Sequence, residues 1–300
     1  MTKLRIQPHG RLNDWVAAEK GYFKDLGLEI EIMGGPERNM LSAFELAHDG
    51  PLRQIRSGAF ESYEEGKGRK GADAGDVSCA CHWTVNQAAR ANEGVMWGKA
   101  YSVCEAAIVV PGDSDVLRPE DLAAREVAVG YHSGSHYSAI QALEVFLPAD
   151  MIRLQFAGTT WSRVDAALAR RVPAANVFGP QLYFLEQQGF RRLLSTTFMM
   201  AFMFPADVDP ADVDKYLQAL VRAQSDIDLE PERYKSCFLR EIPSRYQGMI
   251  DVRRFGVGER VVPQPYSQTI FDKTQAWMHA RKLFDVGPEV GLAYGAAVAS

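Results

Sequence analysis

The sequence has few cysteines and no long apolar run. Four cysteines in 300 residues do not resemble a disulfide framework, and Cys79 and Cys81, separated by one residue, are too close for an easy bridge. The longest apolar run, residues 198–204, ends before Pro205, whereas a membrane-spanning helix needs about 18 residues. We therefore expect reduced thiols and no membrane insertion.

The sequence also lacks basic clusters, internal repeats and an apolar N-terminal segment. Without a Lys/Arg-rich run, and with a formal net charge of −5, nucleic acid is not an expected partner. The first 15 residues carry no secretory signal, which predicts a cytoplasmic location as written, or a periplasmic one if a signal has been removed. The remaining composition, 47% apolar and 24% charged, is typical of a globular protein with one large domain or two lobes.

Chemically versatile side chains concentrate in residues 75–89, GDVSCACHWTVNQAA. The pattern predicts a short buried strand at residues 76–78, followed by a helix capped by Thr84 or Ser78. A helix that starts at the end of a strand is where open α/β sheets bind ligands. The candidate residues of this stretch are Cys79, Cys81, His82 and Trp83.

Three interpretations of this stretch are open. Cysteine and histidine are suitable ligands for zinc, iron or copper, so Cys79, Cys81 and His82 are candidate metal ligands, although one CxCH is not the usual zinc pattern. A thiol beside a histidine at a helix start can be held as a thiolate, which makes the same three residues candidate catalytic groups. In the structural interpretation, small cysteines fill a buried strand end and neutral histidines donate hydrogen bonds to a ligand.

Further candidates lie at other predicted turns. Four histidines are predicted at strand-to-helix turns that open on one cleft: His9, His82, His132 and His136. Trp83 and Trp161 stand in Thr/Ser-containing turns and are candidates for an aromatic lining, whereas Trp15 is expected in the core. Arg163 is either the partner of an anion or a solvated surface residue. The Met/Phe run at 198–204 predicts a buried strand.

Residues 13–30, NDWVAAEKGYFKDLGLEI, lead from a helix into a strand that alternates over 28–32. This segment resembles the opening of the family that joins thiamine-pyrimidine synthases to alkanesulfonate-binding proteins. That family contains solute-binding proteins for alkanesulfonates, nitrate and pyrimidines, and a few enzymes. The resemblance implies an α/β, two-lobed fold of the type II periplasmic-binding-protein kind, with a ligand cleft between lobe I (1–107 and 208–300) and lobe II (108–207).

A second resemblance covers residues 117–145. There an apolar strand, EVAVGY, runs into a Ser-Gly-Ser turn and a helix, so that hydroxyl and backbone N–H groups converge on one point. Such a point suits a carboxylate, sulfonate or phosphate, and in the family this turn holds the anionic end of the ligand. The candidate ligand-binding residues are His9, Asn13, Trp83, His132, Ser133, Gly134, Ser135, His136 and Trp161.

The sequence departs from both enzyme branches of this family. The pyrimidine synthase branch uses a lysine and a histidine near the central stretch and a later cysteine-rich iron motif, but residues 75–89 contain no lysine and no such motif follows. The sulfinate desulfinase branch uses a cysteine after the first strand, where this chain has His9. We therefore predict binding of a small anionic or aromatic organic molecule, with a cytoplasmic Cys/His enzyme as the alternative. Residues 34–75 are interpreted as an added wall or lid of the cleft.

Overall fold

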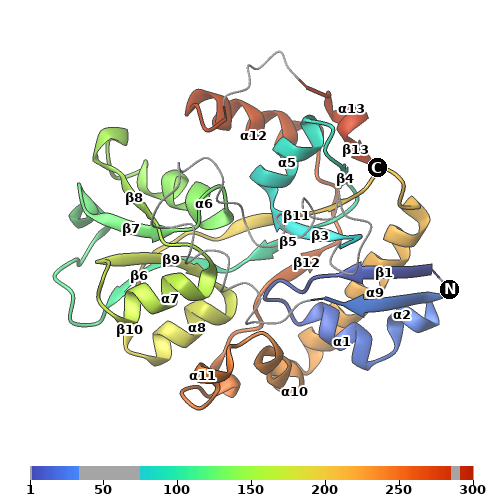
Figure 1. Cartoon of the computed structure of the whole chain (residues 1–300), viewed down its shortest axis with the longest axis horizontal. Helices are drawn as coiled ribbons and strands as arrows, with labels where there is room; N and C mark the ends of the chain where they lie inside the picture. Colours follow the sequence, from blue (N-terminus) through green and yellow to red (C-terminus); the bar gives the residue numbers. More distant parts are fainter. Residues whose placement is uncertain (1, 34–74, 285–290, 300) are drawn as a thin grey trace.

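The computed structural model describes residues 2–33, 75–284 and 291–299, whose strands form three sheets (Figure 1). A parallel pair joins β1 (Thr2–Ile6) to β2 (Leu28–Ile32). The other two sheets each carry helices and define two lobes, seen side by side in Figure 1. The predicted lid falls almost entirely in residues 34–74, outside the described residues.

Lobe II is built on a five-stranded sheet in the order β10-β6-β9-β7-β8. Its strands β6 and β9 are buried on both faces, which explains their nearly continuous apolar sequences. The elements are β6 (Ala106–Pro111), η2 (Pro119–Leu122), β7 (Glu126–Val129), α6 (Gly134–Leu143), η3 (Ala149–Met151), β8 (Arg153–Phe156), α7 (Thr160–Leu168), β9 (Ala174–Phe178), α8 (Gly179–Gln187) and β10 (Phe190–Ser195).

Lobe I contains the β1/β2 pair and a six-stranded sheet in which β11 pairs with β3, β4 and β5. Its strands are β3 (Ser78–Cys81), β4 (Val95–Trp97), β5 (Tyr101–Cys104), β11 (Phe198–Phe204), β12 (Arg260–Val262) and β13 (Val298–Ala299). The helices outside lobe II are α1 (Asn13–Glu19), α2 (Tyr22–Asp25), α5 (His82–Arg90), α9 (Pro210–Leu229), α10 (Pro231–Tyr234), η4 (Lys235–Arg240), α11 (Ser244–Gln247), η5 (Val252–Arg254), α12 (Gln268–Ala280) and α13 (Tyr294–Ala297).

The chain passes between the two sheets twice. The apolar segment expected at 103–110 is divided into β5, in the sheet of lobe I, and β6, in the sheet of lobe II. The chain returns through the link between β10 and β11. The run at 198–204 forms the buried strand β11, as predicted, and α9 begins at Pro210 with Asp209 as its cap.

The predicted boundary inside the central stretch is wrong. The strand occupies residues 78–81 rather than 76–78, because Ser78 to Cys81 pair in antiparallel register with Met203 to Met200 of β11. Consequently α5 begins at His82, and its N-cap is Cys81, which makes no side-chain cap hydrogen bond. The two cysteines are therefore strand residues. Among the described residues, none of the helices has the length and apolar character needed to span a membrane.

Candidate functional site

The two lobes touch at loops that precede their helices. Thr84, in the first turn of α5, donates a hydrogen bond from Oγ1 to the carbonyl oxygen of His132 (3.0 Å), in the loop before α6. His9, in the loop after β1, stacks on Phe178 at the end of β9, with ring centroids 5.4 Å apart. The lobes therefore contact each other at both of these places, which we call the junction.

A buried arginine lies beside the first turn of α6. Arg163 on α7 is only 2% exposed. A Cβ atom placed on Gly130 would lie 2.5 Å from Arg163 Nη1 and 2.9 Å from Ser133 Oγ, which shows how close the guanidinium is to this turn. Within the described ranges, this guanidinium makes no ion pair or hydrogen bond, and Nε is fully buried. The interpretation of Arg163 as a solvated surface residue is therefore wrong.

The charge of Arg163 persists despite its burial. Burial lowers the pKa of Arg163 to about 9, so the guanidinium stays cationic at neutral pH. A buried charge without a counter-ion is costly, and the free N–H groups of a helix start attract the same kind of ligand as a guanidinium does. The first turn of α6 together with Arg163 is therefore a candidate anion site.

The serine hydroxyls of this turn hold the loop in shape. Ser133 Oγ donates to the carbonyl oxygen of Gly130 (2.6 Å), and Ser135 Oγ accepts from the N–H of Gly130 (2.9 Å). The two serine oxygens lie 2.7 Å apart, so the Ser135 proton is engaged with Ser133. The donors that remain for an anion include Arg163, the backbone N–H groups of Gly134 and Ser135, and the Nε2–H of His136, whose Nδ1 accepts a hydrogen bond.

Two neutral histidines flank the turn. His132 has a left-handed backbone (φ 45°), and its N–H donates to Nδ1 of His136 (3.2 Å). Nδ1 of His132 lies 2.5 Å from the hydroxyl oxygen of Tyr137. Burial lowers the pKa of His132 to about 4 and, with a smaller effect of His132, that of His136 to about 3. Both imidazoles are therefore uncharged at neutral pH.

Both thiols of the central stretch are buried and protonated. Cys79 Sγ lies 3.6 Å from Glu259 Oε1, whereas Cys81 Sγ lies 3.0 Å from Thr84 Oγ1. Burial raises the pKa of Cys79, with a further contribution from Glu259, and burial raises the pKa of Cys81 to about 11. A reactive cysteine combines a lowered pKa with partial exposure, so these two have the features of structural cysteines.

His82 and Trp83 are packed at the start of α5. His82 Nδ1 lies 2.9 Å from the hydroxyl oxygen of Tyr266, and burial lowers the pKa of His82 to about 3. Trp83 is 2% exposed, and its ring centroid lies 5.5 Å from that of Tyr137. In the part of the chain that the structure describes, no three His, Cys, Asp or Glu side chains are grouped to hold a metal. The central stretch therefore offers no ligand set for the metal interpretation.

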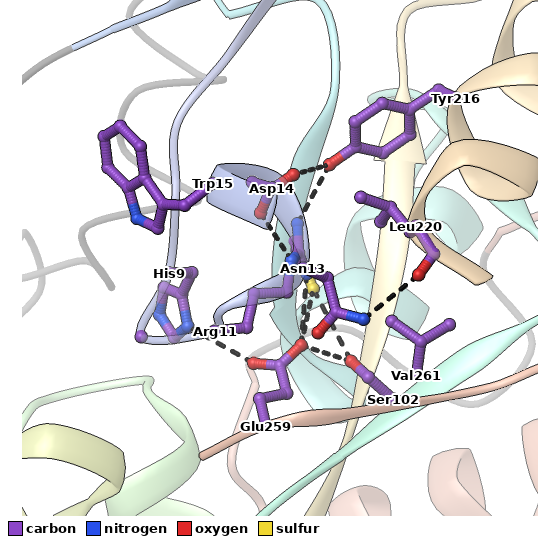
Figure 2. A network of polar contacts seen from close by, with 12 residues as sticks. His9, Arg11, Asn13, Asp14, Trp15, Ser102, Tyr216, Leu220, Glu259 and Val261 are labelled. Carbon is purple, nitrogen blue, oxygen red and sulfur yellow. Dashed lines mark hydrogen bonds and ion pairs between the residues drawn. The ribbon is translucent and has the colours of Figure 1, made fainter. Parts of the chain in front are cut away.

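A buried network of charged side chains lies behind His9 in lobe I (Figure 2). Arg11 donates from Nε to Asp14 Oδ2 (2.6 Å) and from Nη1 to Glu259 Oε1 (3.1 Å). The hydroxyl of Tyr216 donates to Asp14 Oδ1 (2.6 Å) and accepts from Arg11 Nη2 (3.0 Å). One guanidinium thus faces two buried carboxylates.

Glu259 receives its donors on one of its two oxygens. Oε1 accepts from Arg11, Ser102 and Cys79, whereas Oε2 is buried without a hydrogen bond and lies 3.8 Å from His9 Nδ1. Burial acts to raise the pKa of Glu259, but His9, Arg11 and Ser102 favour the charged form, and the net shift is downward. The network therefore holds the loop that carries His9 toward the junction.

Two of the candidate ligand-binding residues lie in helix packing. Asn13 is fully buried and donates from Nδ2 to the carbonyl oxygen of Leu220 and to Gln224 Oε1 on α9 (3.1 Å each), as Figure 2 shows for Leu220. Trp161 is 3% exposed and stacks on Tyr246 of α11, with centroids 5.2 Å apart. The structure gives both residues internal partners.

Sequence reasoning missed the acidic partners of the first loop. Glu259 lies 248 residues from Arg11, and Glu241, which accepts from the N–H of Gly10 (2.6 Å), lies 231 residues away. Isolated acidic residues at such separations carry no local signal. The spacing of three residues between Arg11 and Asp14 is the one sequence feature that indicates part of the network.

No family profile matches the chain, and no curated protein matches it in sequence. Solved structures do match. The alkanesulfonate-binding protein SsuA from Xanthomonas axonopodis pv. citri, bound to MOPS, has 17% identity and a TM-score of 0.66, over 100% of this chain and 98% of that chain. The periplasmic aliphatic sulphonate binding protein SsuA from Escherichia coli has 14% identity and a TM-score of 0.65, over 100% and 92%. The desulfurization enzyme DszB has 13% identity and a TM-score of 0.58, over 100% and 96%.

These similarities extend over both lobes, because each of the three structures covers the whole chain. At such low identities they define the fold, which binding proteins and an enzyme share. The chain has the two-lobed α/β fold of the periplasmic binding proteins, as the sequence resemblance implied.

Proposed function

We propose that the protein binds a small anionic organic molecule between its lobes, with Arg163 as the partner of the anion. The supporting observation is the buried guanidinium, which makes no ion pair within the described ranges and lies beside the first turn of α6. A buried charge that has no partner within the protein is explained if a bound ligand supplies the counter-ion. Alkanesulfonate-binding proteins with the same fold agree with this ligand class.

The proposed site draws on both lobes. Lobe II supplies Arg163 and the N–H groups at the start of α6, and lobe I supplies His9, whose ring is stacked on Phe178. Gly134 lets the start of α6 approach lobe I, since a Cβ atom there would lie 2.4 Å from ring atoms of Phe198. The remaining candidates of the turn shape it: His132, Ser133, Ser135 and His136.

The Cys/His enzyme alternative has weaker support. The fold is compatible with catalysis, as the desulfurization enzyme DszB shows for itself. However, the thiols of Cys79 and Cys81 are buried and protonated, and His82 is engaged with Tyr266. No comparable observation favours a nucleophile in this stretch.

We also propose a periplasmic location, as described for SsuA of Escherichia coli, rather than the cytoplasmic one predicted for the sequence as written. Fractionation of the source cells tests this directly. Release of the protein with the periplasmic fraction is the expected result, and its recovery with cytoplasmic markers would contradict the proposal.

Calorimetric titration with short anions tests the proposed function. We expect saturable one-to-one binding of at least one member of a panel of alkanesulfonates and carboxylates, and no binding of an uncharged sulfone of similar shape. Native mass spectrometry of the purified protein will show whether such a molecule copurifies. Absence of binding across the panel, or equal binding of the uncharged sulfone, would refute the proposal.

Gly130 is expected to be essential for this site. In a Gly130→Ala variant the new methyl group would meet Arg163 Nη1 at 2.5 Å and Ser133 Oγ at 2.9 Å, so the guanidinium must move. We expect the dissociation constant of the anion to rise at least tenfold, because about 1.4 kcal/mol is readily lost when a charge-assisted contact is displaced. The matched control is Gly248→Ala, where a Cβ atom meets nothing within 4 Å. Equal affinities of the two variants would contradict the placement of the site.

Glu144, following α6, connects lobe II to α12 of lobe I. Its Oε1 accepts from Trp277 Nε1 (3.1 Å), and its Oε2 accepts from Arg281 Nε (2.7 Å). The guanidinium of Arg281 also lies over the Trp277 ring, 4.4 Å from its centroid. Since Arg163 is inaccessible in this arrangement, the lobes must separate before a ligand can enter or leave.

A Glu144→Gln variant is therefore expected to release its ligand faster. The amide keeps an acceptor for Trp277 but loses the charge that faces Arg281, and such partly exposed pairs contribute up to about 1 kcal/mol. We predict a roughly two- to fivefold higher dissociation rate by stopped-flow fluorescence. Glu186→Gln, which removes an ion pair with Arg192 inside lobe II, is the control. The idea is wrong if both variants have the same dissociation rate.

A further inference from the structure

Among the described residues, Arg163 brings the charge of the proposed anion site. Burial accounts for the downward shift of its pKa. The first turn of α6 contains no acidic residue, and the two histidines of the turn, His132 and His136, are uncharged at neutral pH. The start of α6 adds roughly half a positive charge through the helix dipole. With Arg163, the site therefore offers between about one and about one and a half positive charges.

Excess charge at this site is not hydrated in the closed arrangement of the lobes. Arg163 is 2% exposed, and the side chains of Ser133, Ser135 and His136 in the neighbouring turn are all buried. In such surroundings an unbalanced charge costs far more than it does in water. The net charge of the ligand thus decides whether the lobes can close over it.

The site also has few hydrogen-bond donors that are free to contact a ligand. The hydroxyl proton of Ser133 is directed at Gly130, and that of Ser135 at Ser133. A monoanion needs fewer strong donors than a phosphate dianion, whose three oxygens are all strong acceptors. The donors that remain are the guanidinium, the first two N–H groups of α6 and the Nε2–H of His136, and among these the guanidinium alone carries a charge.

We infer that the Arg163 site selects ligands with a single negative charge and rejects dianions of similar size, an inference that rests on the proposed function. A sulfonate, a carboxylate or a phosphate diester leaves the closed site neutral or with at most about half a positive charge. A phosphate monoester, doubly charged above its second pKa of about 6, leaves a buried surplus of about half to one negative charge.

Titration with three matched probes tests this inference. Ethanesulfonate and ethyl methyl phosphate are monoanions, and ethyl phosphate is a dianion at about pH 8 and a monoanion at about pH 5. At about pH 8 we expect ethyl phosphate to bind at least about 30-fold more weakly than the two monoanions, which is about 2 kcal/mol. At about pH 5 we expect the difference to shrink to within about threefold.

The ratio of the affinities of ethyl phosphate and the monoanions, measured at one pH, reports the effect of the charge of the ligand. The titratable groups that face the site are His132 and His136 from α6 and its loop, and His9 with Glu259 behind it from lobe I. At about pH 5 all three probes are mainly monoanions, so a change in the charge of these groups acts on them nearly alike. The comparison at about pH 5 therefore depends little on their protonation.

The outcomes separate this inference from the proposed function. Equal binding of ethyl phosphate and ethanesulfonate at about pH 8 would overturn the charge selectivity while leaving anion binding intact. Rejection of ethyl methyl phosphate together with ethyl phosphate would overturn it as well, because shape would then decide. If none of the three probes and no other anion binds, the proposed function fails, and the inference fails with it.

Discussion

Replacement of Arg163 by methionine is expected to abolish anion binding while it stabilises the ligand-free protein. The variant loses the charged donor that the described residues bring to the site, and removal of one member of a buried charge pair costs about 2–5 kcal/mol of binding free energy, which is at least about a 30-fold loss of affinity. The ligand-free protein, in turn, no longer buries a cation that has no counter-ion among the described residues. Apolar replacement of buried ionic groups often stabilises by about 1–4 kcal/mol.

Calorimetry and chemical denaturation measure these two effects. The control is Arg171→Met, the same chemical change at an exposed position soon after α7, which should leave affinity and stability close to wild type. The combination of lost binding with raised stability distinguishes a ligand-binding arginine from a structural one, whose loss would destabilise the fold. A destabilised Arg163→Met variant that still binds the anion would contradict our interpretation.

The second large effect is expected at Arg11, where replacement by methionine should cost about 3–5 kcal/mol of stability. Arg11 is 1% exposed and donates to Asp14 (2.6 Å) and Glu259 (3.1 Å), so its removal leaves two buried carboxylates without their shared cation. Urea denaturation at neutral pH measures the loss. Arg118→Met, which breaks an exposed ion pair with Asp121, is the control and should change stability by less than about 0.5 kcal/mol.

The pH dependence of the Arg11→Met variant should have the opposite sign to that of wild type. In wild type the pKa of Glu259 is lowered, so its contribution to stability is present above the unfolded value of 4.5 and is lost as the pH falls through the folded value. Without Arg11, burial raises the pKa of Glu259, so the variant gains stability as the pH falls. A double variant with Glu259→Gln should recover part of the loss at neutral pH. Identical pH profiles of wild type and Arg11→Met would rule out this account of the network.

Much of the fold could be predicted because its signals are local. The alternation over residues 28–32 and the run at 198–204 each determine a strand by their own pattern, and α9 is indicated by Pro210 and the acidic residue that follows it. The strand of the central stretch was misplaced because Ser-Cys-Ala-Cys has no strong pattern of its own. It becomes a strand by pairing with β11, about 120 residues later in the chain.

The candidate site likewise contains parts that the sequence could predict and parts that it could not. The Ser-Gly-Ser turn could be recognised because a strand, a turn and a helix follow one another in sequence. The burial of Arg163 could not, since it depends on how α7 packs beside Gly130 and Phe178. Glu259 and Glu241 contact the loop after β1 from more than 200 residues away in the chain, and no spacing in the sequence indicates them.

A crystal structure of the protein with ethanesulfonate tests the central claim most directly. We predict the sulfonate between the lobes, with its oxygens within about 2.7–3.2 Å of the Arg163 guanidinium and of the N–H groups at the start of α6. Binding of the sulfonate at any other place, with the Arg163 guanidinium still making no contact to an anion, would contradict it.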